Sequence, residues 1–483
     1  MTHVHSSNET PDLTKSIHEE CGVVGLYGVA DASRLAYYAL HSLQHRGQQG
    51  CGIVTHTPNA DTDFYVHKGE GLVNEIFNEQ NLSLLKGNMA VGHVRYPTSH
   101  VGGIENVQPF TFHHYTGDFA LAHNGNIVNA QQIRNHLEHN GSLLQTTSDS
   151  ELFAHFIVKQ QSSESRIYRI IDALKEVDGA FSLVIMSRQR LYVCRDPYGF
   201  HPLPIGKLGD GYVVASETCA IDAIGATYLR DVEPGEIVSI DHHGLRSNYF
   251  ADIRSHHNCV MEYIYFARPD SDIEGCNVHR FRKIAGELLF EEHPADADIV
   301  VGVPESSLSA AMGYAEASGL PYEMGLIKSK YVGRTFIQPN QEMRDKGVKM
   351  KLSAVRSVVD GKRVVLIDDS IVRGTTSRQI VKMLKDAGAK EVHVRIASPV
   401  YSHPCYYGVD TGTYEELIGA NHSIAEICHF LGADSLCYLS VEALHKATGC
   451  GLCDACFSGI YPSPLYQHEH TDRQSKTRKS STI

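Results

Sequence analysis

Two adjacent acids at the end of an apolar run are the residues of this chain best placed to do chemistry. The run Val364–Ile367 is continuously apolar and largely β-branched, which predicts a buried parallel strand. Asp368 and Asp369 follow it, and their carboxylates can hold two ribose hydroxyls or a hydrated Mg²⁺. The loop beyond them is rich in Gly, Thr and Ser, so it can present N–H groups and hydroxyls to a phosphate at a helix start. An ordinary strand–loop–helix turn of an α/β domain is the alternative, but two adjacent acids together with Gly-Thr-Thr-Ser favour a site for a phosphate with a ribose or a hydrated Mg²⁺.

The stretch resembles the phosphoribosyl pyrophosphate (PRPP) site of type I phosphoribosyltransferases. The resemblance implies that the two acids bind the ribose and that the loop cradles the 5′-phosphate. Val303–Ser307 resembles the pyrophosphate loop of that family, in which Ser306, Asp368 and Asp369 would contact Mg²⁺. Many members carry Asp where this chain has Glu305, which leaves the role of that side chain open. The implied PRPP-binding residues are Asp368, Asp369, Ser370, Arg373, Gly374, Thr375, Thr376 and Ser377, with Lys328 and Arg334 from a basic stretch similar to the family's mobile loop.

A second candidate site begins at Cys21, which precedes a predicted strand. By itself Cys21 favours a buried core position on a first strand over a nucleophile. Four polar clusters at the ends of later apolar runs favour a site. They are Leu43–Gln48, Gly92–Thr98, His123–Ile127 and Thr147–Glu151.

These motifs together resemble the glutamine amidotransferase domain of the N-terminal nucleophile type, over Cys21–Phe250. The resemblance implies that removal of residues 1–20 frees the α-amino group of Cys21. An α-amino group has an ordinary pKa near ~8, which suits a general base for the thiol. Asn124 and the N–H of Gly125 would form the oxyanion hole. Contacts with glutamine would come from Arg95 to the carboxylate, from Asp149 to the ammonium, and from Arg46 and Thr98 around the pocket.

The two halves together resemble the amidophosphoribosyltransferase family, across Cys21–Tyr461. That resemblance implies transfer of ammonia from glutamine to C1 of PRPP, the first committed step of purine synthesis. It also implies inhibition by purine nucleotides and a homotetramer. Another glutamine-dependent transferase, such as glucosamine-6-phosphate synthase or asparagine synthetase, would lack Asp368–Ser377. A PRPP-sensing regulator without catalysis is disfavoured by the intact set around Cys21.

Cysteines near the C-terminus form two overlapping C-x-x-C units, Cys450 to Cys453 and Cys453 to Cys456. Such spacing is compatible with zinc, a redox pair or an iron–sulfur cluster. The resemblance implies the subfamily with a leader and a 4Fe–4S cluster. Cys450 could replace Cys453 in a frame shifted by three residues. The implied ligands are Cys259, Cys405, Cys453 and Cys456.

Composition limits the remaining possibilities. A length of 483 residues predicts two or three domains, and 42% hydrophobic with 20% charged residues is typical of a globular enzyme. The formal net charge of −13 argues against binding to nucleic acid or to a membrane surface. There is no transmembrane-length apolar run and no secretory signal, which indicates a cytoplasmic protein. Twelve dispersed cysteines favour metal or catalytic roles over disulfides.

The predicted elements divide the chain into a leader (1–20), a sheet-rich glutaminase domain (21–255), a phosphoribosyltransferase domain carrying the cluster ligands (256–465) and a tail (466–483). The resemblances imply an Ntn-hydrolase αββα fold followed by a type I phosphoribosyltransferase α/β fold. Alternating strands and helices after Asn258 predict a parallel sheet. Strands are expected at Gly22–Tyr27, Met89–Val94, Phe181–Met186, Ile299–Val303 and Glu391–Ala397, among others, and helices at Ala32–Gln44, Ser150–Gln160 and Ser377–Ala387.

Overall fold

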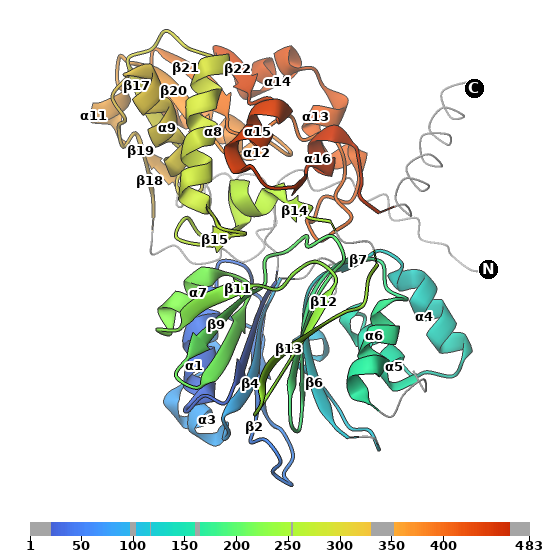
Figure 1. Ribbon diagram of the computed structural model, residues 1–483. Helices are drawn as coiled ribbons and strands as arrows, with labels where there is room; N and C mark the ends of the chain where they lie inside the picture. Colours follow the sequence, from blue (N-terminus) through green and yellow to red (C-terminus); the bar gives the residue numbers. More distant parts are fainter. Residues whose placement is uncertain are drawn as a thin grey trace, which may run out of the picture.

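The computed structural model describes residues 21–96, 103–115, 117–159, 165–252, 255–329 and 352–463. Residues 1–20, Thr98, Arg334 and 466–483, for which the sequence makes predictions, lie outside these ranges. The described chain folds into two sheet-containing regions, one above the other in Figure 1. In the described ranges no helix is long and apolar enough to cross a membrane.

The N-terminal region holds two antiparallel sheets packed face to face. Val23, Val91, Ala122 and Val184 belong to the core between them. The first sheet has the order β11 (Thr227–Asp231), β9 (Pro204–Leu208), β10 (Gly211–Ala215), β1 (Gly22–Tyr27), β4 (Met89–Arg95), β2 (Gly50–His56) and β3 (Tyr65–Gly69). The second has the order β13 (Gly244–Tyr249), β12 (Glu236–Asp241), β8 (Leu191–Arg195), β7 (Gly179–Ser187), β6 (Phe119–Ile127) and β5 (Phe110–Phe112).

Helices cover the outer face of each sheet and complete four layers (Figure 1). Val24 on β1 packs outward against helix α1, whereas its neighbour Val23 faces the other sheet. Because both faces are covered, β1 is a continuous apolar run rather than an alternating pattern. The helices are α1 (Ala32–Ser42), α2 (Val73–Ile76), α3 (Glu79–Leu84) and α7 (Thr218–Ala223) on the first sheet, and α4 (Ala130–His139), α5 (Ser150–Lys159) and α6 (Arg166–Leu174) on the second.

The C-terminal region is built on a four-stranded parallel sheet, as the sequence predicted. Its strands lie in the order β17 (Ile299–Gly302), β20 (Arg363–Asp368), β21 (Glu391–Ile396) and β22 (Ser435–Tyr438). One face packs on α8 (Val278–Glu292), α9 (Leu308–Ser318) and α15 (Val441–Thr448). The other face packs on α11 (Arg356–Val359), α12 (Thr375–Asp386) and α14 (Ile424–Leu431). The carboxyl ends of these strands meet at one edge, where α/β sheets bind ligands.

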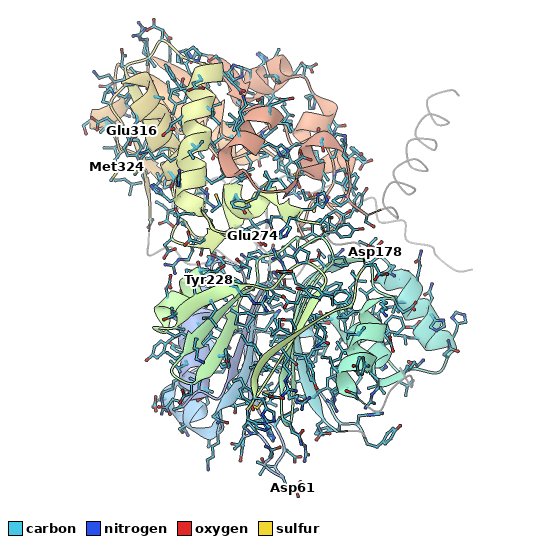
Figure 2. All side chains as sticks on the ribbon, in the orientation of Figure 1. Asp61, Asp178, Tyr228, Glu274, Glu316 and Met324 are labelled. Carbon is cyan, nitrogen blue, oxygen red and sulfur yellow. The ribbon has the colours of Figure 1, made fainter. Side chains whose placement is uncertain are left out.

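Short elements occupy the junction between the two regions and the edges of the second. Arg195 of the first region forms an ion pair of 2.6 Å with Glu274 of the second, and Ser463 donates to Asp178 at 2.6 Å. Figure 2 labels Glu274 and Asp178 at this junction. The short elements are η1 (Ile104–Asn106), β14 (Asn258–Cys259), the π-helical turn η2 (Glu262–Phe266), β15 (Asp272–Ile273), β16 (Cys276–Asn277), β18 (Leu326–Lys328), β19 (Leu352–Ala354), η3 (Tyr414–Glu416), α13 (Ile418–Asn421), β23 (Leu452–Cys453) and α16 (Ala455–Ser458).

Candidate active sites

Cys21 lies directly before β1, at the end of the first sheet where β4 also ends. Its thiol donates to the carbonyl of Tyr96 at 3.4 Å, and the N–H of Tyr96 lies 3.4 Å from the same sulfur. A donor aimed at the sulfur stabilises the thiolate. The structure therefore holds Cys21, half-buried, in a setting that suits a nucleophile.

Asn124 and Gly125 lie on β6 of the second sheet, and Asn124 is 1% exposed. Within the described residues its Nδ2 has no hydrogen-bond partner, although it is buried. Such a donor costs free energy unless something pairs with it. Gly125 adopts φ +137°, and an added Cβ would lie 2.1 Å from the carbonyl oxygen of Ala180. The orphaned amide donor is the feature expected of an oxyanion hole waiting for an anionic oxygen.

Arg95 and Asp149 supply opposite charges around these residues. Arg95 ends β4 and is 8% exposed; burial lowers the pKa of its guanidinium, while the charge of Cys21 opposes that shift. Asp149 accepts the N–H of Ile127 at 2.9 Å, at the end of the strand that carries Asn124. A cation beside Cys21 and an anion beside β6 are compatible with the carboxylate and ammonium of an amino acid substrate.

Arg46 contacts the backbone of Cys21 and two buried carboxylates. Its Nε donates to the carbonyl of Cys21 at 3.1 Å, and its Nη atoms donate to Glu217 at 2.8 Å and to Glu262 at 2.6 Å. Its side chain is fully buried. Because two carboxylates already neutralise the guanidinium, this geometry favours positioning of Cys21 over a direct contact with glutamine.

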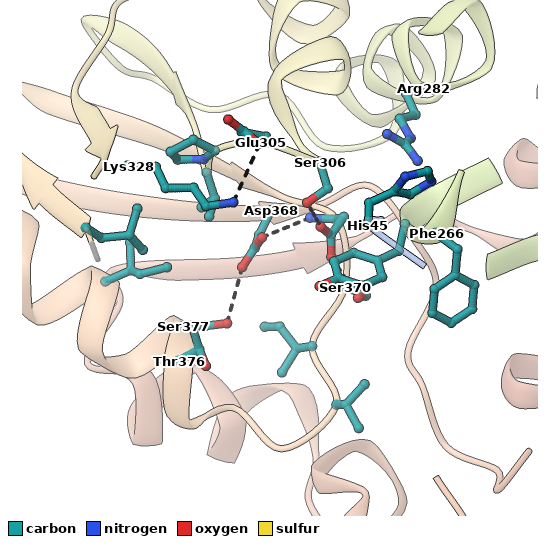
Figure 3. A pocket seen from close by; sticks show the side chains of 18 of the residues that line it. His45, Phe266, Arg282, Glu305, Ser306, Lys328, Asp368, Ser370, Thr376 and Ser377 are labelled. Carbon is teal, nitrogen blue, oxygen red and sulfur yellow. Dashed lines mark hydrogen bonds and ion pairs between the residues drawn. The ribbon is translucent and has the colours of Figure 1, made fainter. Parts of the chain in front are cut away.

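The second candidate site is a cavity of about 350 Å³ at the carboxyl ends of β17 and β20 (Figure 3). Ser306 donates to Asp369, Ser307 donates to Asp368 at 3.2 Å, and Ser377 donates to Asp368 at 3.3 Å. The hydroxyls come from separate segments of the chain, so the pair of acids is where these segments converge. The wall includes the whole stretch from Asp368 to Ser377, together with Pro304, Glu305, Ser306 and Lys328.

The two acids share a buried, crowded position that disfavours their ionisation. Burial, and then the neighbouring charge of Asp369, raises the pKa of Asp368 to about 7. Burial also raises the pKa of Asp369. Arg282 faces the same cavity, and burial lowers the pKa of its guanidinium to about 10 although Asp369 opposes the shift. A bound cation, or hydrogen-bond donors of a ligand, would lower these pKa values and so favour release of the protons to solvent.

One side of the cavity is formed by the start of α12. Gly374 precedes the helix with φ +76°, and an added Cβ would lie 3.0 Å from Ile418, so glycine suits this turn. Thr375, Thr376 and Ser377 form the first turn, where helical N–H groups favour an anion. Arg373 forms an ion pair with Glu416, and Lys328 lies 3.5 Å from Glu305. Glu305 thus holds a cation at the cavity mouth.

The four predicted cluster cysteines come together beside the junction. Cys259 on β14 lies opposite Cys453 on the neighbouring parallel strand β23. Cys405 packs against the cores that contain Cys259, Cys453 and Cys456. Burial raises the pKa of the Cys456 thiol, and the charges of Cys405 and Cys453 raise it further. Across the described part of the chain, no three His, Cys, Asp or Glu side chains are spaced to hold a single metal ion.

The structure also adds residues that the sequence did not single out. His123 donates or accepts a bond of 2.9 Å with the Ser150 hydroxyl, and Gln108 contacts both residues, which fixes the strand beside Asn124. His45 lines the second cavity although it belongs to the first region. Both histidines sit inside polar motifs, but no spacing rule marks them as site residues.

Comparison with known proteins agrees with this two-site architecture. A glutamine amidotransferase domain family matches residues 96–223, and a phosphoribosyl transferase domain family matches residues 277–425. The amidophosphoribosyltransferase of Bacillus subtilis is 54% identical over 461 residues, covering 94% of this chain and 96% of the relative. Amidophosphoribosyltransferase 1 of Arabidopsis thaliana, described as chloroplastic, is 51% identical and covers 92% of this chain and 79% of the relative.

A solved structure shows that the likeness extends to the fold. The glutamine PRPP amidotransferase of B. subtilis, complexed with ADP and GMP, aligns with a TM-score of 0.88 at 54% identity, covering 92% of this chain and 98% of that one. Identity of this level over nearly the whole length establishes common ancestry and a common fold. The chain belongs to the amidophosphoribosyltransferase family.

Proposed function

We propose that this chain converts glutamine, PRPP and water into 5-phosphoribosylamine, pyrophosphate and glutamate. The observation that carries the proposal is that one chain holds a thiol with an N–H group aimed at its sulfur, a buried amide donor without a partner among the described residues, and a cavity with two convergent acids. The first site suits release of ammonia from a carboxamide. The second suits displacement at C1 of a phosphorylated sugar, so the family's reaction uses both.

In the proposed glutaminase step, Sγ of Cys21 attacks the carboxamide carbon and its proton passes to the freed α-amino group. The carbonyl electrons move to oxygen, and Nδ2 of Asn124 with the N–H of Gly125 binds the resulting oxyanion. Collapse breaks the C–N bond and releases ammonia, which takes up the proton held by the amino group. Water then hydrolyses the thioester. Removal of residues 1–20 is part of this proposal, because an internal Cys21 has no free amine.

Truncating the oxyanion donor tests this assignment. We expect Asn124→Ala to lower kcat for glutamine hydrolysis by about 10²–10³-fold, since the orphaned Nδ2 is the group it removes. The KM for glutamine should change far less, because the bond forms mainly in the transition state. Steady-state assay of glutamate release measures both constants. Asn126→Ala, two residues along β6, serves as the matched control, and equal losses in both variants would contradict the assignment.

In the proposed transfer step, the start of α12 binds the 5′-phosphate and the two acids bind the ribose hydroxyls. Ammonia attacks C1, and the bond from C1 to the pyrophosphate oxygen breaks. The oxygen-rich set of Ser306, Asp368 and Asp369 fits Mg²⁺, which is commonly held by two carboxylates together with substrate phosphates. When bound, Mg²⁺ would neutralise charge on the leaving pyrophosphate. The chain's own residues orient the sugar and exclude water around it.

The direct test of the function is pyrophosphate release by processed protein supplied with PRPP and Mg²⁺. We expect release with glutamine and also with ammonium salts, and none without a nitrogen donor. Labelled glutamine should yield labelled glutamate. Release of neither product would favour the PRPP-sensing regulator, and glutamate without pyrophosphate would favour another glutamine-dependent transferase.

A 4Fe–4S cluster held by Cys259, Cys405, Cys453 and Cys456 is also part of the proposal. Its support is the gathering of four thiols from three separate segments, with no disulfide among the described cysteines. A four-iron cluster separates its thiolates more widely than a single ion does, so the failure of a single-ion geometry is compatible with it. When bound, it would supply a crosslink among these segments.

Serine variants distinguish the cluster ligands from their neighbour. We expect Cys456→Ser to lose iron and the absorbance near ~400 nm after anaerobic reconstitution, because one thiolate ligand is gone. Cys450→Ser should keep both, since Cys450 contacts the carbonyl of Glu274 instead. Iron analysis and absorbance spectra provide the measurement. Zinc in place of iron, or loss of the cluster in Cys450→Ser alone, would contradict these ligands.

We also propose that purine nucleotides inhibit the protein, that it forms a homotetramer and that it is cytoplasmic. Inhibition by purine nucleotides is supported by the B. subtilis structure complexed with ADP and GMP. A homotetramer is proposed with it, and light scattering of the processed protein tests that state. A cytoplasmic location is supported by twelve cysteines that are all free, as a reducing compartment keeps them.

A further inference from the structure

His45 is the glutaminase-domain member of the described wall of the PRPP cavity. It follows the end of α1, and its side chain is 27% exposed. Figure 3 shows its ring among the phosphoribosyltransferase residues Phe266, Arg282 and Ser370. The cavity therefore includes one titratable side chain from the domain that carries Cys21.

One edge of the His45 ring is fixed by a buried carboxylate. Nε2 lies 2.7 Å from Oε1 of Glu217. An ionised carboxylate only accepts hydrogen bonds, so Nε2 carries the proton and donates. Although burial of Glu217 raises its pKa, the charges of His45 and Arg46 bring it well below the ordinary value, which keeps the carboxylate ionised. Nδ1 is the ring nitrogen left for a ligand in the cavity.

Glu217 also holds the cavity wall and the residue behind Cys21. Its carboxylate accepts the N–H of Arg268 at 2.9 Å, and Arg268 lines the cavity. The same carboxylate accepts Nη1 of Arg46 at 2.8 Å. Arg46 in turn donates from Nε to the carbonyl of Cys21 at 3.1 Å. Three consecutive hydrogen bonds thus connect the His45 ring to the backbone of the nucleophile.

A second set of contacts closes the network from the other domain. Glu262 accepts from Arg46 at 2.6 and 2.9 Å, and it begins the turn η2. Tyr265 and Phe266 of that turn line the PRPP cavity. The guanidinium of Arg46 is therefore held between two carboxylates, each continuous with the cavity wall. A displacement of either carboxylate changes the hold of Arg46 on Cys21.

We propose that His45 is a positioning residue that couples occupancy of the PRPP cavity to the reactivity of Cys21, through Glu217 and Arg46. When PRPP binds, the ring takes up a solvent proton at Nδ1, and the Nδ1–H group donates to an anionic oxygen of PRPP. The resulting shift of the ring is passed through Glu217 and Arg46 to the Cys21 carbonyl. The inference rests on the proposed function of the cavity. Coupling of this kind is reciprocal, so occupancy of the glutamine site changes the affinity for PRPP by the same factor.

The test is the rate at which iodoacetamide alkylates Cys21 in processed enzyme, with and without saturating PRPP and Mg²⁺. In wild type we expect the two rates to differ by at least about 5-fold, the lower end of measured couplings. In His45→Ala the ratio should fall to about one. His45→Gln retains a donor for Glu217 but has no second nitrogen, so its ratio should also approach one. His41→Gln, on an exposed turn of α1, should keep the wild-type ratio.

The ratio of the alkylation rates with and without PRPP distinguishes coupling between the sites from a general structural defect. If His45→Ala slows alkylation equally with and without PRPP, so that the ratio persists, His45 is only structural and the proposal is overturned. A wild-type ratio of one overturns it as well, as does His45→Gln with an unchanged ratio. Should His45→Ala fail to fold, His45→Gln carries the test. Wild type that releases no pyrophosphate from PRPP and ammonium would refute the proposed function itself.

Discussion

Cys21→Ser is expected to abolish glutamine-dependent synthesis while ammonia-dependent synthesis persists. Loss of an activated nucleophile typically lowers the rate by on the order of 10⁴-fold or more, because a serine hydroxyl is not ionised by a terminal amine as a thiol is. The described wall of the PRPP cavity contains neither Cys21 nor Tyr96, so ammonium salts should bypass the lesion. Pyrophosphate release with each nitrogen donor measures the two activities in one preparation.

Cys437→Ser is the matched control, since this half-buried cysteine lies on β22 outside the described wall of the PRPP cavity. It should retain both activities. Because Cys21 touches the strand end that carries Tyr96, the Ser variant also needs a check of folding by circular dichroism. Loss of ammonia-dependent synthesis in a folded Cys21→Ser enzyme would mean that the thiol serves the transfer step too, contrary to the division of labour proposed above.

Asp369→Asn is expected to have opposite effects on catalysis and on stability. Synthesis with either nitrogen donor should fall by about 10²-fold or more, because the variant loses a charge that faces the ribose and the cation in the proposed transfer step. The free energy of unfolding at pH 8 should rise, because the substitution removes the charge that opposes ionisation of Asp368. A gain in stability with a loss of activity is typical of residues that a site needs and the fold does not.

The pKa of Asp368 determines how the difference in stability between wild type and Asp369→Asn changes with pH. The pKa of Asp368 is raised to about 7 in the folded protein, above its ordinary value, so the folded state binds the proton more tightly than the unfolded chain does. The contribution of protonated Asp368 to the free energy of unfolding is fully present below the unfolded pKa near ~4 and is lost as the pH rises through about 7. Wild type and Asp369→Asn should therefore unfold alike near pH 4 and diverge by pH 8.

Thermal unfolding at several pH values, with and without Mg²⁺, measures these differences. Mg²⁺ should restore stability to wild type at pH 8 more than at pH 5, since it competes with protons for the two carboxylates. Asp386→Asn, an exposed acid at the end of α12 that pairs with Lys382, is the control and should change little. An Asp369→Asn protein that is less stable than wild type at pH 8 would show that the pair is held by attraction rather than strained by repulsion.

Local sequence was enough to predict which residues line the second cavity between Asp368 and Ser377. Val364–Ser377 is one continuous strand, loop and helix start, so the acids and the phosphate-binding turn are neighbours along the chain and need no distant contact to be placed. The same holds for the parallel sheet, whose apolar strands predict burial on both faces. Strand β2, with glycines at 50 and 52, was not expected, because its close packing depends on neighbours that local periodicity does not reveal.

Local motifs supplied the candidate residues for each proposed reaction: Cys21, the pair Asn124 and Gly125, and Asp368 to Ser377. The surroundings of these residues depend on contacts between segments that are distant in the sequence. Arg46 was expected to shape or close the glutamine pocket, and the sequence did not reveal that it is buried between Glu217 and Glu262, which lie 171 and 216 residues away. His45 likewise lines the PRPP cavity because the packing of the two domains places it there. A buried charge must be paired, and its partners are the groups that the packing of the two domains brings close to it. Local periodicity and spacing do not predict those partners.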